Sequence, residues 1–445
     1  MNIKMPKEVI RIIELLDSYN YEAFVVGGCL RDSLLQKKPC DWDICTDCEP
    51  NEIIRIFGER GIKTIPTGLK HGTISLIVND KTFEVTTYRV EENYIDNRRP
   101  ANVKFTKSLL EDLSRRDFTI NSMAYNQTKG LVDPFNGKED LENKVIRAVG
   151  NSNERFKEDS LRIVRGVRFA TELGFNFDLY TVKGILQNKE LLKNISKERI
   201  NAELNKILLS SVPSKGFYLF KELDLLDYII PQLKIFINFN QKNPRHDKDI
   251  FEHTMMVLDN TENDLILRLA ALLHDIGKPL TFTQDNEGMG HFYNHHSIGS
   301  SIAEDILNDL RYDNTIIKKV KILIKEHMSK YNELTDKAAK RLINRVGKDN
   351  IYRLFMLQRA DIKGSMPPYD FSKIDYLEKK CIEIINNKEP LSVKDLKING
   401  YDLMKIGIKP GKEIGFILNS LLEKVLENPE LNNKEDLLDL VKEKF

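Results

Sequence analysis

Two aspartates separated by one residue are the first groups in this chain that could do chemistry. Asp41 and Asp43 flank Trp42, and Ile44 follows. In a β-strand, residues i and i+2 project from the same face, so both carboxylates would point together while Trp42 and Ile44 turn to the core. Carboxylates this close repel each other unless a cation lies between them, and such oxygen ligands suit Mg²⁺ carried with substrate phosphates. The pattern predicts Asp41 and Asp43 as catalytic magnesium ligands; the simpler alternative is a solvated pair on an edge strand.

A glycine pair lies upstream of these acids. Residues 24–26 are typical of a strand, and Gly27-Gly28 leads through Arg31 into an expected helix. Glycines at such a junction let phosphate oxygens approach backbone N–H groups, and a helix N-terminus favours negative charge. A glycine pair alone would mark only a turn, but together with the two aspartates it favours a nucleotide site. Gly28 and Arg31 are therefore expected to contact phosphate or ribose.

Four charged residues recur at every third position further along, at Asp159, Arg162, Arg165 and Arg168. This spacing predicts that they share one broad face of a helix. An Asp beside an Arg offers acceptors and forked donors that could meet the edge of a nucleobase, and the other arginines could hold a triphosphate. The alternative is an ordinary salt-bridged surface helix. The opposite, buried face would be formed by the apolar residues between them, Ile163, Val167 and Ala170.

These elements occur in the order of a known family. Residues 25–32, followed by Asp41-Trp42-Asp43, resemble the nucleotidyltransferase signature of the DNA polymerase β superfamily, in particular of class II tRNA CCA-adding enzymes and bacterial poly(A) polymerases. Further segments are similar to the family's ribose-selecting element, hinge, nucleobase-reading helix and helix brace: residues 115–121, residues 133–137 before Asp140-Leu141, residues 158–168, and Arg199 with Glu203-Leu204.

The resemblance implies a template-independent enzyme that adds CCA to tRNA 3′ ends from CTP and ATP and releases pyrophosphate. It implies that Arg116 contacts phosphate or ribose, and that Asp159 and Arg162 select CTP and then ATP. Residues 94–100 resemble the flexible loop of members that add A, which argues against a CC-only enzyme. An A-adding enzyme or a poly(A) polymerase of the same family stays open, as does a phosphohydrolase with a nucleotide-sensing head.

A third acid could complete the metal site. Glu84 lies in a run of β-branched and aromatic residues, 83–89, that is typical of a neighbouring strand. The resemblance covers this segment but gives Glu84 no defined role.

A second constellation lies in the C-terminal half, where His274-Asp275 ends an apolar stretch. A lone histidine on an apolar helix is normally a core residue, but this pair is accompanied by further histidines and an aspartate. Together they resemble the HD phosphohydrolase domain, which implies a divalent metal held by His253, His274, Asp275 and Asp361. Imidazole and carboxylate ligands suit Mn, Fe, Ni or Zn, and a bound metal could activate water against a phosphoester. Further histidines resemble the extra ligands of dinuclear members, namely His295 and His327, with His291 or His296 as substitutes.

The elements that must position these groups change character along the chain. Short β-like runs bounded by Gly, Asn or Asp fill the first 150 residues, and helical periodicity continues from there to the C-terminus. This predicts an α+β nucleotidyltransferase head followed by a long all-α body that includes an HD domain. The expected domains are 1–150, the head; 151–240, a helical neck for nucleobase and RNA; 241–370, the HD domain; and 371–445, a helical tail. Residues 399–403 and 409–411 resemble the tail that grips tRNA.

The composition of the chain limits its possible partners and its cellular compartment. The chain has 445 residues with a net charge of +1, so a contact with the tRNA 3′ end must come from local basic patches rather than from a generally basic surface. Five cysteines, an odd number, favour a reducing compartment over a disulfide framework; zinc binding by Cys40, Cys45 and Cys48 is the lesser alternative. No signal peptide or membrane span is apparent, which favours a cytoplasmic protein without a membrane partner.

Overall fold

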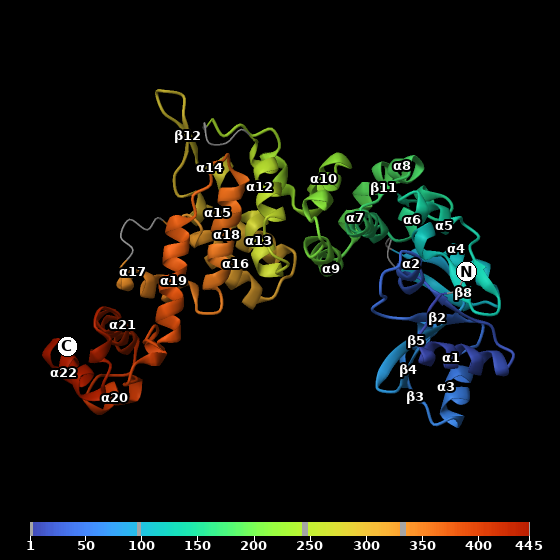
Figure 1. Ribbon diagram of the computed structural model, residues 1–445, viewed down its shortest axis with the longest axis horizontal. Helices are drawn as coiled ribbons and strands as arrows, with labels where there is room; N and C mark the ends of the chain where they lie inside the picture. The colour runs from blue at the N-terminus through green and yellow to red at the C-terminus, as the bar shows by residue number, and fades with distance from the viewer. Residues whose placement is uncertain (1–2, 96–98, 243–247, 330–334, 445) are drawn as a thin grey trace. The chain divides into compact units, whose positions relative to one another are not determined.

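The computed structural model describes residues 3–95, 99–242, 248–329 and 335–444 (Figure 1). The chain divides into two compact units, Met1–Pro231 and Gln232–Phe445. The side chains of the expected flexible loop, residues 94–100, and His246 lie outside the described residues. None of the described helices is both long and apolar enough to cross a lipid bilayer.

The strands of the first unit gather in its N-terminal part: β1 (Ala23–Val26), β2 (Asp43–Thr46), β3 (Lys63–Gly68), β4 (Thr73–Val78), β5 (Lys81–Thr87), β6 (Arg89–Ile95), β7 (Arg99–Phe105), β8 (Ala124–Asn126), β9 (Gly130–Val132), β10 (Val145–Ile146) and β11 (Asn176–Phe177). In the described residues, seven of them form one sheet in the order β3-β4-β5-β2-β1-β8-β9. β2 is antiparallel to β1 and parallel to β5, and the register sets Asp43 opposite Val26 on one side and Glu84 on the other.

β2 begins two residues later than the sequence predicts. Asp43 is its first residue, and Asp41 lies just before the strand. The reason is the partner strand: Val26 pairs with Asp43, and the next residue, Gly27, turns away with φ 73°. On the β1 side, residues 41 and 42 therefore have no strand partner among the described residues.

The helices of the first unit are α1 (Lys7–Ser18), α2 (Gly28–Leu34), α3 (Pro50–Glu59), α4 (Leu109–Ser114), α5 (Gly137–Glu142), α6 (Ser152–Glu158), α7 (Leu161–Leu173), α8 (Leu179–Asn188), α9 (Lys197–Leu208), α10 (Ser214–Glu222) and α11 (Leu226–Ile229), with the short 3₁₀ helices η1 (Leu69–His71), η2 (Thr119–Asn121) and η3 (Lys189–Asn194). α1 buries Val9, Ile12, Ile13 and Leu16 at helical spacing. The sheet core beneath is apolar: Phe24, Val26, Cys45, Tyr88, Leu113 and Ala124.

The prediction of one continuous helix through Asp159 is wrong. α6 ends at Glu158, and Asp159 is extended, with φ −138° and ψ 100°. Its Oδ1 accepts a hydrogen bond from the backbone N–H of Leu161 at 3.2 Å, so the side chain occupies the start of α7 as a local cap. The predicted buried face of α7 is confirmed, because Ile163, Val167 and Ala170 are fully buried.

The second unit is mainly helical: η4 (Pro231–Phe236), α12 (Ile250–Asp259), α13 (Leu265–Leu273), α14 (Lys278–Thr281), β12 (Phe282–Gln284), β13 (Gly290–Phe292), α15 (His295–Asp309), α16 (Asn314–Glu326), α17 (Asp336–Val346), α18 (Ile351–Gly364), α19 (Ser372–Asn386), η5 (Val393–Asp395), α20 (Gly400–Lys405), α21 (Lys412–Glu427), η6 (Pro429–Leu431) and α22 (Lys434–Lys444). α13 is apolar almost all round and is buried among α12, α16 and α18. The predicted α+β head and helical body are confirmed.

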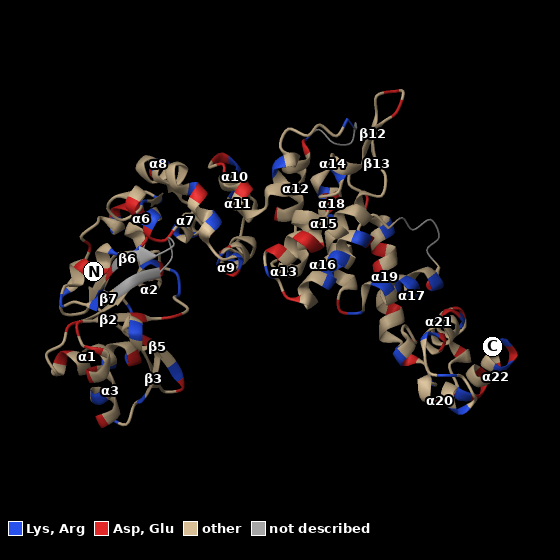
Figure 2. Ribbon diagram, turned by 180° about the vertical axis from the view of Figure 1, so that it is seen from behind, with Lys and Arg blue, Asp and Glu red and all other residues tan. Residues whose placement is uncertain are grey.

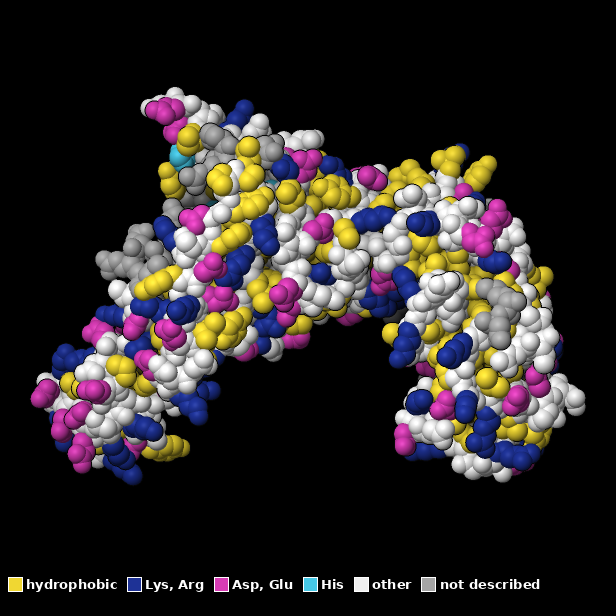
Figure 3. Space-filling model, viewed as in Figure 1, with side chains coloured by type: hydrophobic (Ala, Val, Ile, Leu, Met, Phe, Trp, Pro, Cys, Tyr) yellow, Lys and Arg dark blue, Asp and Glu magenta, His cyan; other side chains and the backbone are white. Residues whose placement is uncertain are grey.

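Charge is distributed evenly over the helices. Basic and acidic side chains are both scattered over the helices of the two units (Figure 2). On the face shown in Figure 3, α20, α21 and α22 present acidic, basic and apolar side chains side by side. Acidic and basic residues are nearly equal in number, which gives the net charge of +1. A cluster of positive charge is therefore expected inside a pocket rather than on the surface.

Candidate functional site

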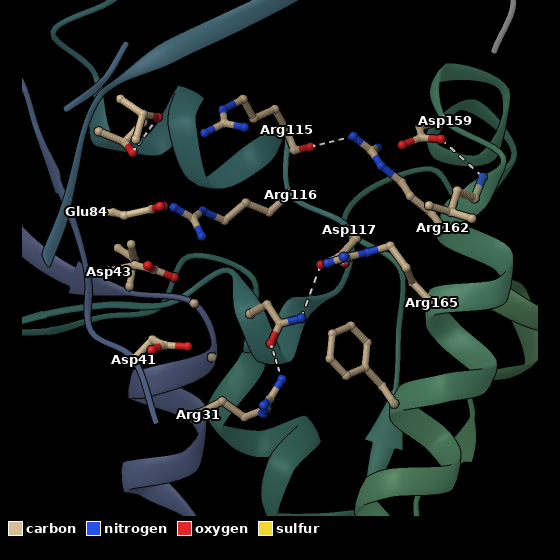
Figure 4. A pocket seen from close by; sticks show the side chains of 18 of the residues that line it. Arg31, Asp41, Asp43, Glu84, Arg115, Arg116, Asp117, Asp159, Arg162 and Arg165 are labelled. Carbon is tan, nitrogen blue, oxygen red and sulfur yellow. Dashed lines mark hydrogen bonds and ion pairs between the residues drawn. The ribbon is translucent and has the colours of Figure 1, made fainter. Parts of the chain in front are cut away.

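A pocket of about 780 Å³ opens in the first unit. Carboxylates line one end of it, and arginines from α2, from residues 115–116 and from α7 line the rest (Figure 4). A volume of this size suits a nucleotide-sized ligand. The first-unit residues that the sequence predicts to bind metal, phosphate, ribose or base all line this pocket: Gly28, Arg31, Asp41, Asp43, Glu84, Arg116, Asp159, Arg162, Arg165 and Arg168.

Three carboxylates meet at the acidic end. Asp41 and Asp43 point into the pocket from the same side, and Glu84 stands beside them because β2 and β5 pair in parallel (Figure 4). Burial raises the pKa of Asp43, the negative charge of Glu84 raises it further, and Arg116 acts in the opposite direction. A divalent cation would relieve this repulsion, and the oxygen-only donor set fits Mg²⁺.

Gly27 lets an arginine approach these acids closely. A Cβ atom at Gly27 would lie 3.3 Å from Nη1 of Arg116 and 3.8 Å from Oδ2 of Asp43, in a left-handed backbone that disfavours other residues. Nε of Arg116 is buried and makes no hydrogen bond within the described chain. Arg116 therefore brings a positive charge next to the carboxylates, where it would attract a phosphate group.

A buried aspartate on α4 holds the arginine pair. Asp112 is fully buried and accepts hydrogen bonds from Nε of Arg115 at 3.0 Å, Nη2 of Arg116 at 3.2 Å and the backbone N–H of Arg89 at 3.3 Å. Burial acts to raise the pKa of Asp112, but the charges of Arg116 and Arg115 outweigh it and lower the pKa. Arg115 also donates to Glu91 at the start of β6, at 3.2 Å.

A second carboxylate, Asp117, holds the arginine from α7. Nε and Nη2 of Arg165 donate to its Oδ2 at 2.9 and 2.6 Å, and Asn121 donates to Oδ1 at 3.2 Å. Burial acts to raise the pKa of Asp117, but Arg165 outweighs it and lowers the pKa to about 2. Asn121 accepts in turn from Arg31 at 2.9 Å.

The residues predicted to read a base have separate partners. Asp159 receives a two-pronged interaction from Arg199, with distances of 3.2 and 2.7 Å. Arg162 donates to Glu158 at 2.8 Å and to the backbone carbonyl of Arg115 at 2.9 Å. Both side chains are thus held in place while they line the pocket, at the end away from the carboxylates (Figure 4).

Three arginines surround one aromatic ring. The guanidinium carbons of Arg31, Arg165 and Arg168 lie 5.1, 5.5 and 3.9 Å from the ring centre of Phe169. Cations over a ring face are attracted by its negative π-surface, which offsets part of their mutual repulsion. Nothing in the sequence pattern pointed to Phe169. Thr86, another lining residue that the sequence analysis missed, could have been found, because it is two positions after Glu84 on the same strand.

The second unit brings together the other predicted constellation. Its helices place ligand atoms of His253, His274 and Asp361 within 4.8 Å of one another, and those of Asp275, His295 and His327 within the same distance. We call these six residues the histidine–aspartate cluster. Gly277 permits it: a Cβ atom there would lie 2.2 Å from the backbone oxygen of His295, so only glycine allows this approach to α15.

Asp275 links the two halves of this cluster. Its Oδ2 lies 3.1 Å from Nε2 of His274 and 3.5 Å from that of His253, whereas Oδ1 lies 3.5 Å from Nε2 of His295 and 4.0 Å from that of His327. Nε2 of His274 is buried and has no hydrogen-bond partner in the described part of the chain. A buried ring nitrogen without a partner, facing carboxylates, fits a metal ligand.

Ionisation in the histidine–aspartate cluster follows from burial and charge. Burial acts to lower the pKa of His274, but Asp275 outweighs it and raises the pKa to about 10. Burial and the nearby charge of His274 lower the pKa of His327 to about 3, which keeps that ring neutral. The two alternatives from the sequence lie apart from the cluster: His291 pairs with Asp285 at 2.8 Å, and His296 is not among its ligand groups in the described chain.

Three family models match successive parts of the chain. A family model described as the Poly A polymerase head domain matches residues 23–147. One described as the probable RNA and SrmB-binding site of polymerase A matches residues 174–236, and one described as tRNA nucleotidyltransferase domain 2 matches residues 280–441.

Two relatives that match over nearly the whole chain are both CCA-adding enzymes. The CCA-adding enzyme of Ligilactobacillus salivarius is 33% identical over 440 residues, which cover 98% of this chain and 96% of the relative. The CCA-adding enzyme of Pediococcus pentosaceus is 32% identical over 425 residues, 95% of this chain and 94% of the relative. The crystal structure of the Bacillus stearothermophilus CCA-adding enzyme in complex with CTP superimposes with a TM-score of 0.73 at 25% identity and 99% coverage of both chains. The chain belongs to the family of CCA-adding enzymes.

Proposed function

We propose that this chain adds C, C and A to the 3′ end of tRNA from CTP and ATP, and that the pocket of the first unit carries out the reaction. The carrying observation is the layout of that pocket: Asp41, Asp43 and Glu84 at one end, and Asp159 with Arg162 at the other. Membership of the CCA-adding family supports the same activity. The ribose 3′-hydroxyl forms a bond to the α-phosphorus of the incoming nucleotide, and pyrophosphate leaves.

Each group of the pocket has a part in this reaction. Asp41 and Asp43 hold magnesium, and Glu84 completes the carboxylate set. Magnesium, when bound, activates the attacking hydroxyl and stabilises the leaving pyrophosphate. Arg116 supplies positive charge beside the acids for a phosphate group.

The remaining residues bind the nucleotide. Gly28, Arg31, Arg165 and Arg168 surround the triphosphate with backbone N–H and guanidinium donors. The edge of the base meets Asp159 and Arg162, whose orientations are fixed by Arg199 and Glu158. Base selection then needs no nucleic-acid template, because the protein supplies both acceptor and donor groups.

Primer extension tests this function. Three tRNA transcripts, ending before the first C, after one C and after both, are incubated with the full chain, Mg²⁺, and CTP and ATP singly and together. We expect C, C and a single A in that order. Addition of A alone would indicate an A-adding enzyme, and a long A tract would indicate a poly(A) polymerase. No extension under any mixture would refute all of these activities.

We further propose that the division of labour follows four segments: 1–150 for catalysis, 151–240 for nucleobase and RNA, 241–370 for the histidine–aspartate cluster, and 371–445 for tRNA. The pocket draws on the first two segments, since Asp43 comes from β2 and Arg165 from α7. Crosslinking of 4-thiouridine-substituted tRNA, followed by mapping of the attached peptides, tests the assignment of the tail. Crosslinks confined to residues before 371 would contradict it.

We propose a second activity for the second unit, that of an HD-type metal-dependent phosphohydrolase. The carrying observation is the histidine–aspartate cluster, with His253, His274 and Asp361 on one side of Asp275 and two more histidines on the other. A divalent transition metal held there activates water for attack on a phosphoester when it is bound. The protein's own part is to bury the ligands and keep His295 and His327 in the neutral form that binds metal; burial lowers the pKa of both rings.

Metal analysis and a phosphodiester assay test this second activity. Purified full chain, dialysed against Mn²⁺, Ni²⁺ or Zn²⁺ and then desalted, is analysed for metal by mass spectrometry. We expect at least one tightly held ion per chain, and hydrolysis of bis(p-nitrophenyl) phosphate by the loaded protein. A metal-free protein would contradict both parts, and a loaded but inactive one would leave a structural site only.

A further inference from the structure

Asn121 forms a bridge between two of the pocket arginines. It lies in η2 and is 7% exposed. Its Oδ1 accepts from Nη1 of Arg31 at 2.9 Å, and its Nδ2 donates to Oδ1 of Asp117 at 3.2 Å. Asp117 in turn holds Arg165 through Oδ2. One continuous chain of hydrogen bonds thus runs from α2 to α7 across the floor of the pocket (Figure 4).

This bridge brings two positive charges together. Arg31 and Arg165 both face the ring of Phe169, at 5.1 and 5.5 Å, where they repel each other. Asp117 supplies one negative charge between them, and Asn121 transmits the constraint to Arg31. Without the bridge, Arg31 would lose its link to α7 and keep only its contacts with Asp32 and the ring.

The chemistry of the bridge requires an amide. The side chain must accept a hydrogen bond from a guanidinium on one side and donate one to a carboxylate on the other. Asparagine does both in a single orientation, because the flipped amide would set N–H against N–H and oxygen against oxygen. Aspartate could accept but not donate, and leucine could do neither.

We propose that Asn121 is a positioning residue that sets the spacing of Arg31 and Arg165 for the triphosphate of the incoming nucleotide. This inference rests on the proposed function, since it takes the pocket as a nucleoside triphosphate site. Asn121 acts through the two arginines and need not touch the substrate itself.

Two substitutions separate positioning from space filling. In Asn121→Asp, two carboxylates face each other at the bridge; at low pH a proton shared between them restores the missing donor. In Asn121→Leu, the volume stays similar and both hydrogen bonds are lost at every pH. The positive groups around the bridge are Arg31 from α2, Arg116 beside Asp117, and Arg162, Arg165 and Arg168 from α7; the negative groups are Asp117 itself, Asp32 beside Arg31, and Glu203 near Arg165 and Arg168.

The experiment measures CTP affinity of the full chain by calorimetry at pH 5.5, 7.0 and 8.5, each variant relative to wild type. At pH 8.5 both variants are expected to bind CTP at least about tenfold more weakly, because each loses at least one hydrogen bond to a charged group. The deficit of Asn121→Asp should shrink as the pH falls, whereas that of Asn121→Leu should stay constant. Asn126→Asp, a buried asparagine outside the pocket, controls for a general effect of the substitution.

Every result decides. Wild-type affinity in both variants overturns the inference. If Asn121→Leu does not fold, the near-isosteric Asn121→Asp carries the test alone. A wild-type chain that binds CTP but extends no tRNA would refute the proposed function, and the calorimetric ratios would still decide the role of Asn121.

Discussion

The two units gather charged side chains in opposite ways. In the pocket of the first unit, carboxylates and arginines form many separate pairs around an open space of about 780 Å³. In the histidine–aspartate cluster, six side chains converge on one another, and five of them are buried. The shape and charge of the pocket suit a large polyanion, whereas the ligand atoms of the cluster are close enough together to suit metal ions.

The difference teaches what each arrangement requires from the chain. In the pocket, two arginines are held at a useful distance by carboxylates that are themselves fixed: Asp112 fixes Arg116, and Asp117 fixes Arg165. A metal needs no such intermediary, because its ligands can point directly at it. The pocket should therefore tolerate loss of metal from the cluster, and the cluster should tolerate loss of an acid from the pocket.

The largest expected effect comes from Asp43→Ala. Removing this carboxylate takes away a magnesium ligand, and we expect tRNA extension to fall by about 1,000-fold or more, because preorganised charge stabilisation is the main contribution to such reactions. Extension rates under single-turnover conditions measure it, and metal content of the second unit should stay at the wild-type value. Asp80→Asn, exposed in the turn between β4 and β5, is the matched control. Extension within tenfold of wild type would show that Asp43 is not a metal ligand.

The converse substitution is His274→Ala. It removes a buried ligand of the histidine–aspartate cluster, and we expect metal affinity there to fall by about 100-fold or more, beyond the 10–100-fold typical of losing an outer partner. Competition with a fluorescent chelator measures the affinity. tRNA extension should not change, and His291→Ala, which alters a half-buried histidine outside the cluster, should change neither. A loss of extension in His274→Ala would show that the two sites are coupled.

Asp112→Asn asks whether the pocket depends on its buried carboxylate. Two arginines would lose their common negative partner in a fully buried place, and we expect the first unit to lose about 3 kcal/mol of stability, the usual result of breaking a buried ion pair. Urea denaturation followed by circular dichroism measures this. Glu111→Gln, one residue away and exposed on α4, should cost less than about 0.5 kcal/mol. Equal stability of the two variants would show that the arginines find other partners.

The pH dependence of stability gives a smaller effect with a definite sign. The pKa of Asp117 is lowered from 3.8 to about 2 in the folded chain. Its stabilisation is therefore fully present above about pH 5 and is lost as the pH falls through 4 toward 2, with a total on the order of 2 kcal/mol. The difference in unfolding free energy between wild type and Asp117→Asn should shrink between pH 5 and pH 2.5. A constant difference would show that Arg165 does not lower the pKa of Asp117.

The sequence predicted the residues of the two sites more fully than the residues that hold them in place. Asp41 with Asp43, and His274 with Asp275, are close in sequence, so local spacing reveals them. Local spacing also gave one wrong prediction, because it placed Asp159 inside a helix. The helix begins two residues later, at Leu161, and Asp159 caps its start. Supporting residues come from distant segments and leave no periodic signal.

Asn121 and Phe169 show why residues that position the site could not be predicted from the sequence. The amide of Asn121 meets Arg31 from ninety positions away, and only the packing of η2 on α2 brings the two together. Phe169 is one of 21 phenylalanines, and its place in the sequence differs in no way from that of a core residue. Their roles depend on three-dimensional contacts that periodicity does not encode.

The smallest expected effect is that of Phe169→Leu. Leucine keeps an apolar side chain beneath Arg31, Arg165 and Arg168 but removes the π-surface that attracts them, a change of about 0.5–1 kcal/mol for arginines that line an open pocket. CTP affinity should therefore fall about threefold, as measured by calorimetry. Phe175→Leu removes the same volume from a phenylalanine that is just as buried but does not line the pocket, and should leave CTP affinity unchanged. An equal loss of CTP affinity in both variants would mean that the positions of the arginines depend on core volume rather than on the aromatic ring. Asp112, Asp117 and Asn121 alone would then hold the arginines of the pocket in place.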